Sequence, residues 1–255
     1  MLNKNIIQNK LHGVEIITWE ITGSTNNDAR EMIKYRPNDT LIVAEEQTSG
    51  RGRQGKSFIS PNGGLYMTLL VRCSLPIKEA VGATSCSAVA LVRALKKLCG
   101  LDAQIKWVND IYVGGKKLCG ILTEAINDYD RDITEYLIIG IGVNITSSPK
   151  IDSLAPNSVE TVSLNELGVY ISREELCAEI TNELLLLRES RFEFSSVADE
   201  YTSRSAVIGR EITFIKNGAA HNGQALGIDK NGALIVESGG ECFLLDSGEI
   251  SVRLN

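Results

Sequence analysis

The stretch GRGRQGKS at residues 50–57 is followed directly by turn-forming residues, and this order restricts the fold around it. The eight residues fit the pattern G-x-x-x-x-G-K-[ST] of a phosphate-binding P-loop, in which a helix must begin at the lysine. Here the turn sequence PNGG at 61–64 and the apolar run LYMTLLV at 65–71 come next instead. Proline and glycine end helices, whereas that apolar run is rich in strand formers. The sequence therefore predicts a loop between two strands and disfavours the alternative of a noncatalytic P-loop nucleotide-binding module.

Apolar periodicity in the rest of the first 205 residues predicts an α/β layout around one sheet. The segment 14–35 moves from an alternating strand pattern through a Gly-Ser-Thr turn into a helix, with Ser24 or Thr25 as its cap. Further strands are expected at 41–46, 65–72, 103–110, 111–125 and 135–145, and further helices at 77–98, 172–188 and 195–203.

The pattern of apolar and turn-forming residues changes after about residue 206. Short apolar segments are separated by the turn clusters KNG, HNG, DKNG, SGG and DSG, which recur roughly every 8 to 10 residues. Such spacing is typical of a small β-barrel. We therefore expect two domains, a catalytic domain at 1–205 and a small barrel at 206–255.

Composition excludes several classes of protein. The net charge of −6 argues against a general nucleic-acid binder, because phosphate neutralisation needs clustered lysine and arginine. The six cysteines form no CxxC pair, and with His12 and His221 as the only histidines no protein metal site is expected. There is no GxSxG motif and no apolar run of the roughly 20 residues that span a bilayer. We expect a cytoplasmic protein with reduced cysteines and no membrane contact.

The loop at 50–57 concentrates glycines and cations. Three glycines make the backbone pliable, and three cations within six residues repel one another unless an anion is bound. The sequence therefore favours a loop that closes over phosphate, the alternative being a solvated basic turn. The residues are Gly50, Arg51, Gly52, Arg53, Gly55 and Lys56.

A second polar cluster is the stretch KWVND at 106–110. A two-residue turn at Gly114-Gly115 predicts a hairpin that brings Asp110 near Lys117 on the neighbouring strand. Taken alone, such a pair is also typical of a surface ion pair.

Together these stretches resemble the biotin protein ligase family, whose signature combines a GRGRxGR loop with a KWPND hairpin and a KLxGIL-like strand. Here they stand as GRGRQGK and KWVND…KKLCGIL, in that order and about fifty residues apart. The resemblance extends to STN at 24–26, AEEQTSG before the loop, GIGVNI at 140–145 and GIDKNGALIV…GEISVR at the end, and so covers nearly the whole chain from about residue 14.

The resemblance implies an α+β fold, with a mixed-sheet catalytic domain of the biotin/lipoate ligase type and a C-terminal SH3-like β-barrel. It also implies an enzyme, a biotin–[acetyl-CoA-carboxylase] ligase. Biotin and MgATP would give biotinyl-5'-AMP, which would then acylate one lysine of a biotin carboxyl carrier protein. The implied cofactors are ATP, biotin and Mg2+. Lipoate protein ligase, a related fold acting on the same kind of lysine, is the alternative enzyme.

Some family members carry an N-terminal DNA-binding domain. About a dozen residues precede the first expected strand here, too few for such a domain, so we expect a short form that does not bind DNA. The oligomeric state is left open between monomer and homodimer.

The resemblance also implies roles for individual residues. Lys117, Arg53 and Asp110 would be catalytic, with Asp110 orienting or deprotonating the acceptor lysine. Biotin would be bound by Ser24, Thr25, Gln47, Arg51, Lys117 and Gly120. ATP or the adenylate would be bound by Gly50, Arg51, Gly52, Arg53, Phe58, Asn109, Asn144 and Arg253.

The chain departs from the family pattern at three positions. Val108 replaces a proline, Lys56 replaces the last loop arginine, and Phe58 replaces a tryptophan. Valine frees the backbone of the hairpin, lysine keeps the charge but loses bidentate geometry, and phenylalanine offers a smaller aromatic face.

Overall fold

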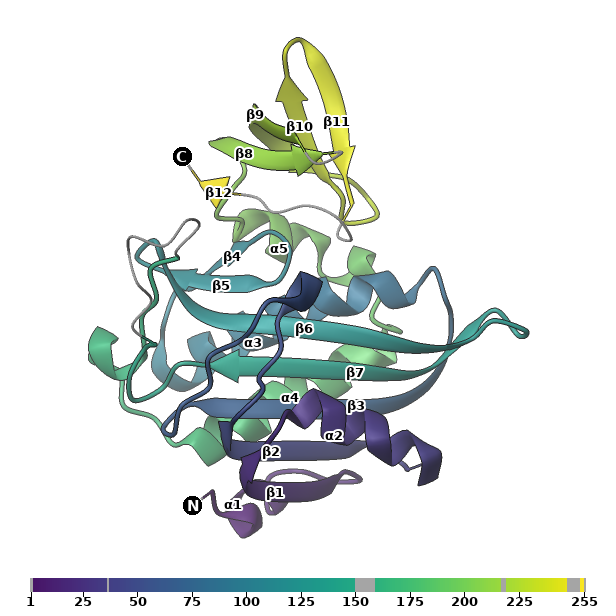
Figure 1. Cartoon of the computed structure of the whole chain (residues 1–255), viewed down its shortest axis with the longest axis vertical. Coiled ribbons are helices and arrows are strands. Elements are labelled where there is room, and N and C mark those ends of the chain that lie inside the picture. The colour runs from purple at the N-terminus through teal and green to yellow at the C-terminus, as the bar shows by residue number, and fades with distance from the viewer. Residues whose placement is uncertain (1, 36, 150–158, 217–218, 247–252, 255) are drawn as a thin grey trace.

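The computed structural model describes residues 2–35, 37–149, 159–216, 219–246 and 253–254. A seven-stranded mixed sheet in the order β1-β2-β3-β7-β6-β5-β4 forms the larger part of the molecule (Figure 1). Its strands are β1 (Glu15–Thr22), β2 (Thr40–Gln47), β3 (Leu65–Pro76), β4 (Gln104–Lys106), β5 (Asp110–Val113), β6 (Lys116–Asp128) and β7 (Ile133–Val143). Strands β1 and β2 are parallel, and the other neighbours in the sheet are antiparallel.

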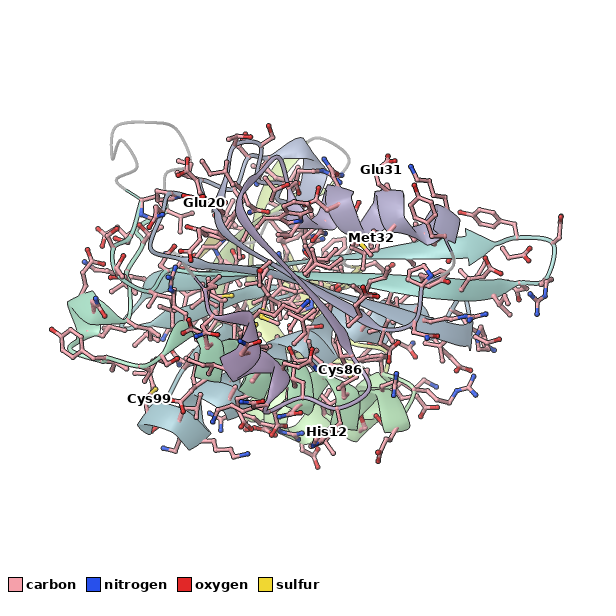
Figure 2. All side chains as sticks on the ribbon, turned by 90° about the horizontal axis from the view of Figure 1, so that it is seen from below. His12, Glu20, Glu31, Met32, Cys86 and Cys99 are labelled. Carbon is pink, nitrogen blue, oxygen red and sulfur yellow. The ribbon has the colours of Figure 1, made fainter. Side chains whose placement is uncertain are left out.

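Helices cover both faces of this sheet. The described helices are α1 (Lys4–Gln8), α2 (Thr25–Met32), α3 (Ala83–Cys99), α4 (Arg173–Glu189) and α5 (Ala198–Ser203). Figure 2 shows α2, marked by Glu31 and Met32, on one side of the sheet and α3, with Cys86 and Cys99, on the other. Short 3-10 turns lie at Ile33–Tyr35, Arg53–Gly55, Ala80–Gly82, Asn165–Leu167 and Phe194–Ser196.

The side chains of β3 point alternately to the two faces of the sheet, and this alternation explains why helices cover both faces. Leu69 and Val71 are buried in the large core with α3 and α4, whereas Leu70 packs in a smaller core with Ala29 of α2. Successive side chains of a strand point to opposite faces, so an almost continuous apolar strand can serve two cores. At Thr68 the α2 face of β3 becomes polar, and the site described below begins there.

A second, five-stranded antiparallel sheet follows α5 at one end of the molecule (Figure 1). Its order is β11-β10-β9-β8-β12, with β8 (Glu211–Lys216), β9 (Ala219–Ile228), β10 (Leu234–Ser238), β11 (Glu241–Leu245) and β12 (Arg253–Leu254). The expected small β unit after residue 206 is therefore present. The domain boundary between residues 205 and 206 stays a prediction.

The C-terminal part contacts the stretch KWVND directly. The indole Nε1 of Trp107 donates to Gly232 O at 3.0 Å, and the Tyr201 hydroxyl donates to Val108 O at 3.0 Å. The backbone of Ile105 makes two further hydrogen bonds around the expected domain boundary. Ile105 N donates to Arg204 O, and Ala206 N donates to Ile105 O, each at 2.8 Å. These bonds hold the stretch KWVND against α5 and the turn between β9 and β10.

The predicted strands and long helices are present, and most begin and end within a few residues of their expected bounds. The helix expected from residue 77 begins at Ala83, and the strand expected at 103–110 ends at Lys106 because residues 107–109 form a turn. Helix α1 was not expected; its Ile7 is fully buried against the main core. Ser24 is the N-cap residue of α2, but its side chain makes no capping hydrogen bond. Among the residues that the structure describes, no helix combines the length and the apolar character that crossing a lipid bilayer requires.

Candidate active site

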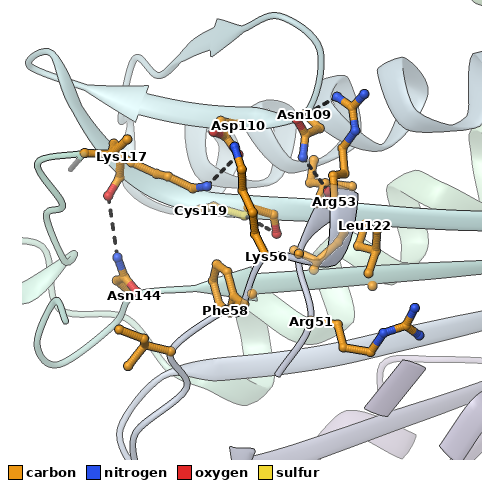
Figure 3. A pocket seen from close by; sticks show the side chains of 18 of the residues that line it. Arg51, Arg53, Lys56, Phe58, Asn109, Asp110, Lys117, Cys119, Leu122 and Asn144 are labelled. Carbon is orange, nitrogen blue, oxygen red and sulfur yellow. Dashed lines mark hydrogen bonds and ion pairs between the residues drawn. The ribbon is translucent and has the colours of Figure 1, made fainter. Parts of the chain in front are cut away.

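A cavity of about 830 Å³ lies between the loop at 50–58, the N-terminus of α2 and the hairpin of β5 and β6 (Figure 3). Strands β6 and β7 supply part of its lining. Twelve of the fourteen predicted site residues line it: Ser24, Thr25, Gln47, Arg51, Gly52, Arg53, Phe58, Asn109, Asp110, Lys117, Gly120 and Asn144. Residues up to about 120 positions apart in the sequence therefore meet in one place.

Neutral polar groups form one end of the cavity. The Thr25 backbone N–H and hydroxyl both donate to Gln47 Oε1, at 2.9 and 3.1 Å, and Gln47 Nε2 donates to Ser60 Oγ at 2.9 Å. Ser24, at the start of α2, is 2% exposed. Hydroxyl and amide groups that donate and accept in fixed positions suit a neutral polar ring better than a charged group.

Three residues to which the sequence analysis assigned no role, Thr68, Asn26 and Glu124, extend this polar end. Thr68 Oγ1 lies 2.7 Å from Thr25 Oγ1 and 2.7 Å from Asn26 Oδ1, and Asn26 Nδ2 donates to Glu124 Oε2 at 3.0 Å. A Cβ at Gly140 would lie 2.0 Å from Asn26 Oδ1, so this position requires glycine. The sequence signals were the stretch STN for Asn26, a threonine in the apolar run of β3, and a glutamate that shares a strand face with Gly120.

Glu124 also holds the first arginine of the loop. Arg51 lies 3.3 Å from Glu124 and donates to Asn27 Oδ1 at 2.9 Å, while Arg30 bonds the same carboxylate at 2.8 Å. In Figure 3 the Arg51 side chain is turned away from the ion pair of Lys117. Arg51 therefore contacts the polar end of the cavity in this structure.

The charged end of the cavity contains two coupled contacts. Lys117 Nζ is 2.7 Å from Asp110 Oδ1, and Arg53 Nη1 donates to Asn109 Oδ1 at 3.2 Å (Figure 3). Asn109 Nδ2 donates in turn to Ile121 O at 2.7 Å, which fixes its orientation. Burial lowers the pKa of the Arg53 guanidinium, although the charge of Asp110 opposes that shift. Two cations are thus held in place by groups of the hairpin.

The Phe58 ring packs against a part of the sheet that consists of glycines. Gly120 of β6 pairs with Gly142 of β7, and a Cβ at Gly142 would lie 2.3 Å from the Phe58 ring. The ammonium of Lys117 is 5.9 Å from the centre of this ring, and Tyr66 meets it edge-on at 6.4 Å. The pair of glycines makes room for the flat Phe58 ring next to the Lys117 ammonium.

Asn144 is buried at the far edge of the cavity. Its Nδ2 donates to Val162 O at 3.1 Å and lies 3.5 Å from Lys117 O. Its amide hydrogens therefore hold the segment after residue 159 against β6. The expected binding of ATP or the adenylate by Asn109 and Asn144 stays a prediction.

Two predicted residues do not line the cavity as described. Gly50 lies at the base of the loop, where a Cβ would meet Phe58 O at 2.3 Å and Ser60 Oγ at 2.6 Å. The backbone of Arg253 pairs with Thr213 in the C-terminal sheet, but its side chain falls outside the described residues.

Within the described ranges no three histidine, cysteine, aspartate or glutamate side chains converge to hold a metal ion. Asp110 and Glu160 are the aspartate and glutamate that line the cavity there. Magnesium keeps several waters and is usually bound through one or two carboxylates together with substrate phosphates. The cavity fits a magnesium ion that arrives with a nucleotide.

The sequence matches two family models. Residues 15–144 match the Biotin/lipoate A/B protein ligase family, and residues 207–253 match the Biotin protein ligase C terminal domain. A bifunctional ligase/repressor BirA from Bacillus subtilis is 31% identical over 91% of this chain and 72% of its own length. A biotin–[acetyl-CoA-carboxylase] ligase from Paracoccus denitrificans is 30% identical over 84% of this chain and 91% of its own length.

Solved structures show the same fold. Biotin protein ligase from Aquifex aeolicus, in complex with biotin and ATP, superposes with a TM-score of 0.73 at 23% identity, over 94% of this chain and 99% of that one. Biotin protein ligase from Leishmania major, in complex with biotinyl-5-AMP, gives a TM-score of 0.62 at 26% identity, over 91% and 99% of the two chains. With both family models matched in order along one chain, this protein belongs to the biotin protein ligase family.

Proposed function

We propose that this protein attaches biotin to a lysine of an acceptor protein at the expense of ATP, through biotinyl-5'-AMP. The observation that carries the proposal is the two-ended cavity. Neutral hydrogen-bonding groups around Thr25 and Gln47 lie at one end, where Glu124 balances the charge of Arg51. The cations Arg53 and Lys117 lie at the other end. Biotin has the same division, with a neutral ureido ring at one end and a carboxylate at the other.

The first half-reaction brings together two anions. The biotin carboxylate attacks the α-phosphate of ATP, so positive charge must reduce the repulsion between the two reactants. In our proposal Lys117 lies between the carboxylate and the phosphate, and Arg53 neutralises charge on the phosphate. A magnesium ion held by the triphosphate, with Asp110 as the nearby carboxylate, would shield the leaving pyrophosphate.

The second half-reaction needs a neutral amine. An acceptor lysine with an ordinary pKa of about 10.4 is almost entirely protonated at neutral pH. We assign Asp110 to orient this amine and accept its proton, because its carboxylate lies in the cavity beside Lys117. The amine then attacks the carbonyl carbon of biotinyl-5'-AMP, an amide forms, and AMP leaves.

The proposed acceptor is the biotinyl domain of a biotin-dependent carboxylase. The relative from Paracoccus denitrificans is named for such a carboxylase, which supports the choice. We place the reaction in the cytoplasm on the cysteine pattern, since the six cysteines are free thiols. We further propose a monomer or homodimer that does not bind DNA, and a gel shift with the operator of the host's biotin genes tests the last point.

The test of the proposed function is pyrophosphate release from ATP in the presence of biotin, of lipoate, or of neither. Release with biotin is the expected result. Release with lipoate instead would assign the chain to lipoate ligation, and release that needs neither acid would point to a nucleotide hydrolase. Transfer of biotin to a purified biotinyl domain then tests the second half-reaction.

A further inference from the structure

Three lysines of the described chain line the cavity, and their surroundings differ. Lys117 is paired with Asp110 at 2.7 Å, and Lys106 lies 3.4 Å from the Tyr112 hydroxyl, with its ammonium over the same ring. Lys56 is exposed, and its ammonium makes no hydrogen bond or ion pair with the residues that the structure describes. An ammonium held in an ion pair is a poor nucleophile, whereas an unpaired amine can react once it loses its proton.

The position of Lys56 directs this amine into the cavity. It ends the 3-10 turn Arg53–Gly55, and its backbone is fixed at both ends, because Gly52 N donates to Lys56 O at 2.7 Å and Lys56 N donates to Arg53 O at 3.1 Å. Figure 3 shows its side chain extending from the loop across the cavity in the direction of Asp110. A backbone held in this way limits where the four-carbon side chain can place its amine.

We propose that Lys56 is a modification site of this chain, biotinylated in cis by the adenylate formed in the same cavity. The inference rests on the proposed function, since it needs biotinyl-5'-AMP as the acyl donor. The neutral amine of Lys56 attacks the carbonyl carbon, the bond from that carbon to the phosphate oxygen breaks, AMP leaves, and the amine loses one proton to solvent. No other reactant is needed.

Proximity is the reason for expecting this reaction without an acceptor protein. A nucleophile held beside a reactive acyl group reacts far faster than the same group in solution, with effective concentrations that reach 10⁵ M or more in well-oriented cases. A biotinyl domain that docks its own lysine would compete for the same adenylate. Labelling of Lys56 is therefore expected to be largest when acceptor is absent.

The test is a peptide map of the full chain after incubation with biotin and MgATP, without acceptor. Trypsin does not cleave after an acylated lysine, so biotin on Lys56 leaves the peptide 54–72 intact between Arg53 and Arg72. The expected result is biotin on this peptide, at a rate per molecule unchanged by a roughly tenfold dilution of the protein, as an intramolecular reaction requires. The labelling should rise with pH, because the neutral amine reacts, and fall when a purified biotinyl domain is added.

Matched variants separate this site from general leakage of adenylate. Lys56→Arg keeps the charge and removes the nucleophile, so the labelled 54–72 region should be lost. Lys34→Arg removes a lysine in the 3-10 turn that follows α2, 59% exposed and 3.5 Å from Glu31, and should leave labelling unchanged. Pyrophosphate release is measured in each sample to show that adenylate is still formed.

Three outcomes would overturn the inference. Biotin spread over Lys34 and other surface lysines as strongly as over Lys56 would show reaction with released adenylate. Wild-type chain that releases pyrophosphate and labels a biotinyl domain, but carries no biotin on 54–72, would show that Lys56 does not react. Absence of biotin-dependent pyrophosphate release would instead remove the proposed function, and this inference with it.

Discussion

Replacing Lys117 by alanine separates the chemical role of the charged end from its structural role. The Lys117 side chain is 23% exposed, and its ammonium lies 2.7 Å from the carboxylate of Asp110, whose side chain is 21% exposed. Its backbone bonds, from Lys117 N to Glu160 O at 2.8 Å and from Val162 N to Lys117 O at 3.0 Å, do not depend on the side chain. The variant should therefore fold, with a loss of about 1 kcal/mol from the partly exposed ion pair.

The expected effect on catalysis is much larger than the effect on folding. Lys117→Ala removes one fixed cation from the cavity and leaves the negative Asp110 facing two anionic reactants. Loss of one preorganised electrostatic contact costs on the order of 100- to 1000-fold in rate, or about 2.7 to 4 kcal/mol. We expect biotin-dependent pyrophosphate release to fall by at least about 100-fold.

The neighbouring lysine supplies a matched control. Lys116 precedes Lys117 on β6, points to the opposite face, and forms an exposed pair with Glu160 at 3.2 Å. Lys116→Ala should keep a near-normal rate of pyrophosphate release. Near-normal release by Lys117→Ala, or equal losses in both variants, would refute the assignment of Lys117 to the reaction; thermal melting shows whether either variant fails to fold.

Three further predictions concern the same molecule. Asp110→Asn should slow single-turnover transfer from preformed adenylate more than it slows adenylate synthesis, and equal losses would point to a structural or metal-related role. Arg53→Gly should make adenylate slowly but release it, so that added serum albumin becomes biotinylated on a blot; no more albumin labelling than with wild type, at retained synthesis, would contradict this. Burial raises the pKa of Glu45, but Arg173 at 2.7 Å, the backbone N–H of Leu2 and the N-terminal charge together outweigh burial. The folded pKa is therefore below the ordinary value, and the stabilisation is lost as pH falls through it. Glu45→Gln should therefore lower the free energy of unfolding by about 3 kcal/mol near neutral pH and reduce its fall with acid below about pH 4.3. The control Glu79→Gln, in an exposed ion pair, should change the free energy of unfolding and its pH dependence little. Urea unfolding at several pH values measures both variants.

Most of the fold could be predicted from the sequence because turn residues and apolar periodicity mark where its strands and helices begin and end. The turn residues PNGG ended any helix after the loop, and the structure has the strand β3 from Leu65. The pair Gly114-Gly115 predicted a two-residue hairpin turn, and both glycines have positive φ, 58° and 79°. Helix α1 was missed because it has five residues, and its position depends on tertiary packing of Ile7.

The contacts inside the site were harder to predict because they depend on register and on distant strands. Asp110 and Lys117 are not ladder partners. Lys117 pairs with Tyr112, and a bulge at Leu118 shifts the register before Asp110 pairs with Gly120. A hairpin pattern predicts that two residues are near one another, but a bulge is set by the packing of both strands. The contact of Glu124 with Arg51 joins residues 73 positions apart, which no local pattern in the sequence indicates.

The glycines of the loop show why a chain can match the P-loop pattern without having a P-loop. In a P-loop the first glycine begins a turn whose backbone amides face phosphate. Here Gly50 sits where the loop closes on itself: Phe58 N donates to Gly50 O at 2.8 Å, and a Cβ would overlap Phe58 O and Ser60 Oγ. Gly55 has φ of +71°, which turns the chain before Lys56. Both positions need glycine for the closure of a loop between two antiparallel strands, so the same spacing of glycine and lysine arises here without a helix. In the proposed function the contacts with phosphate are therefore assigned to the arginine and lysine side chains.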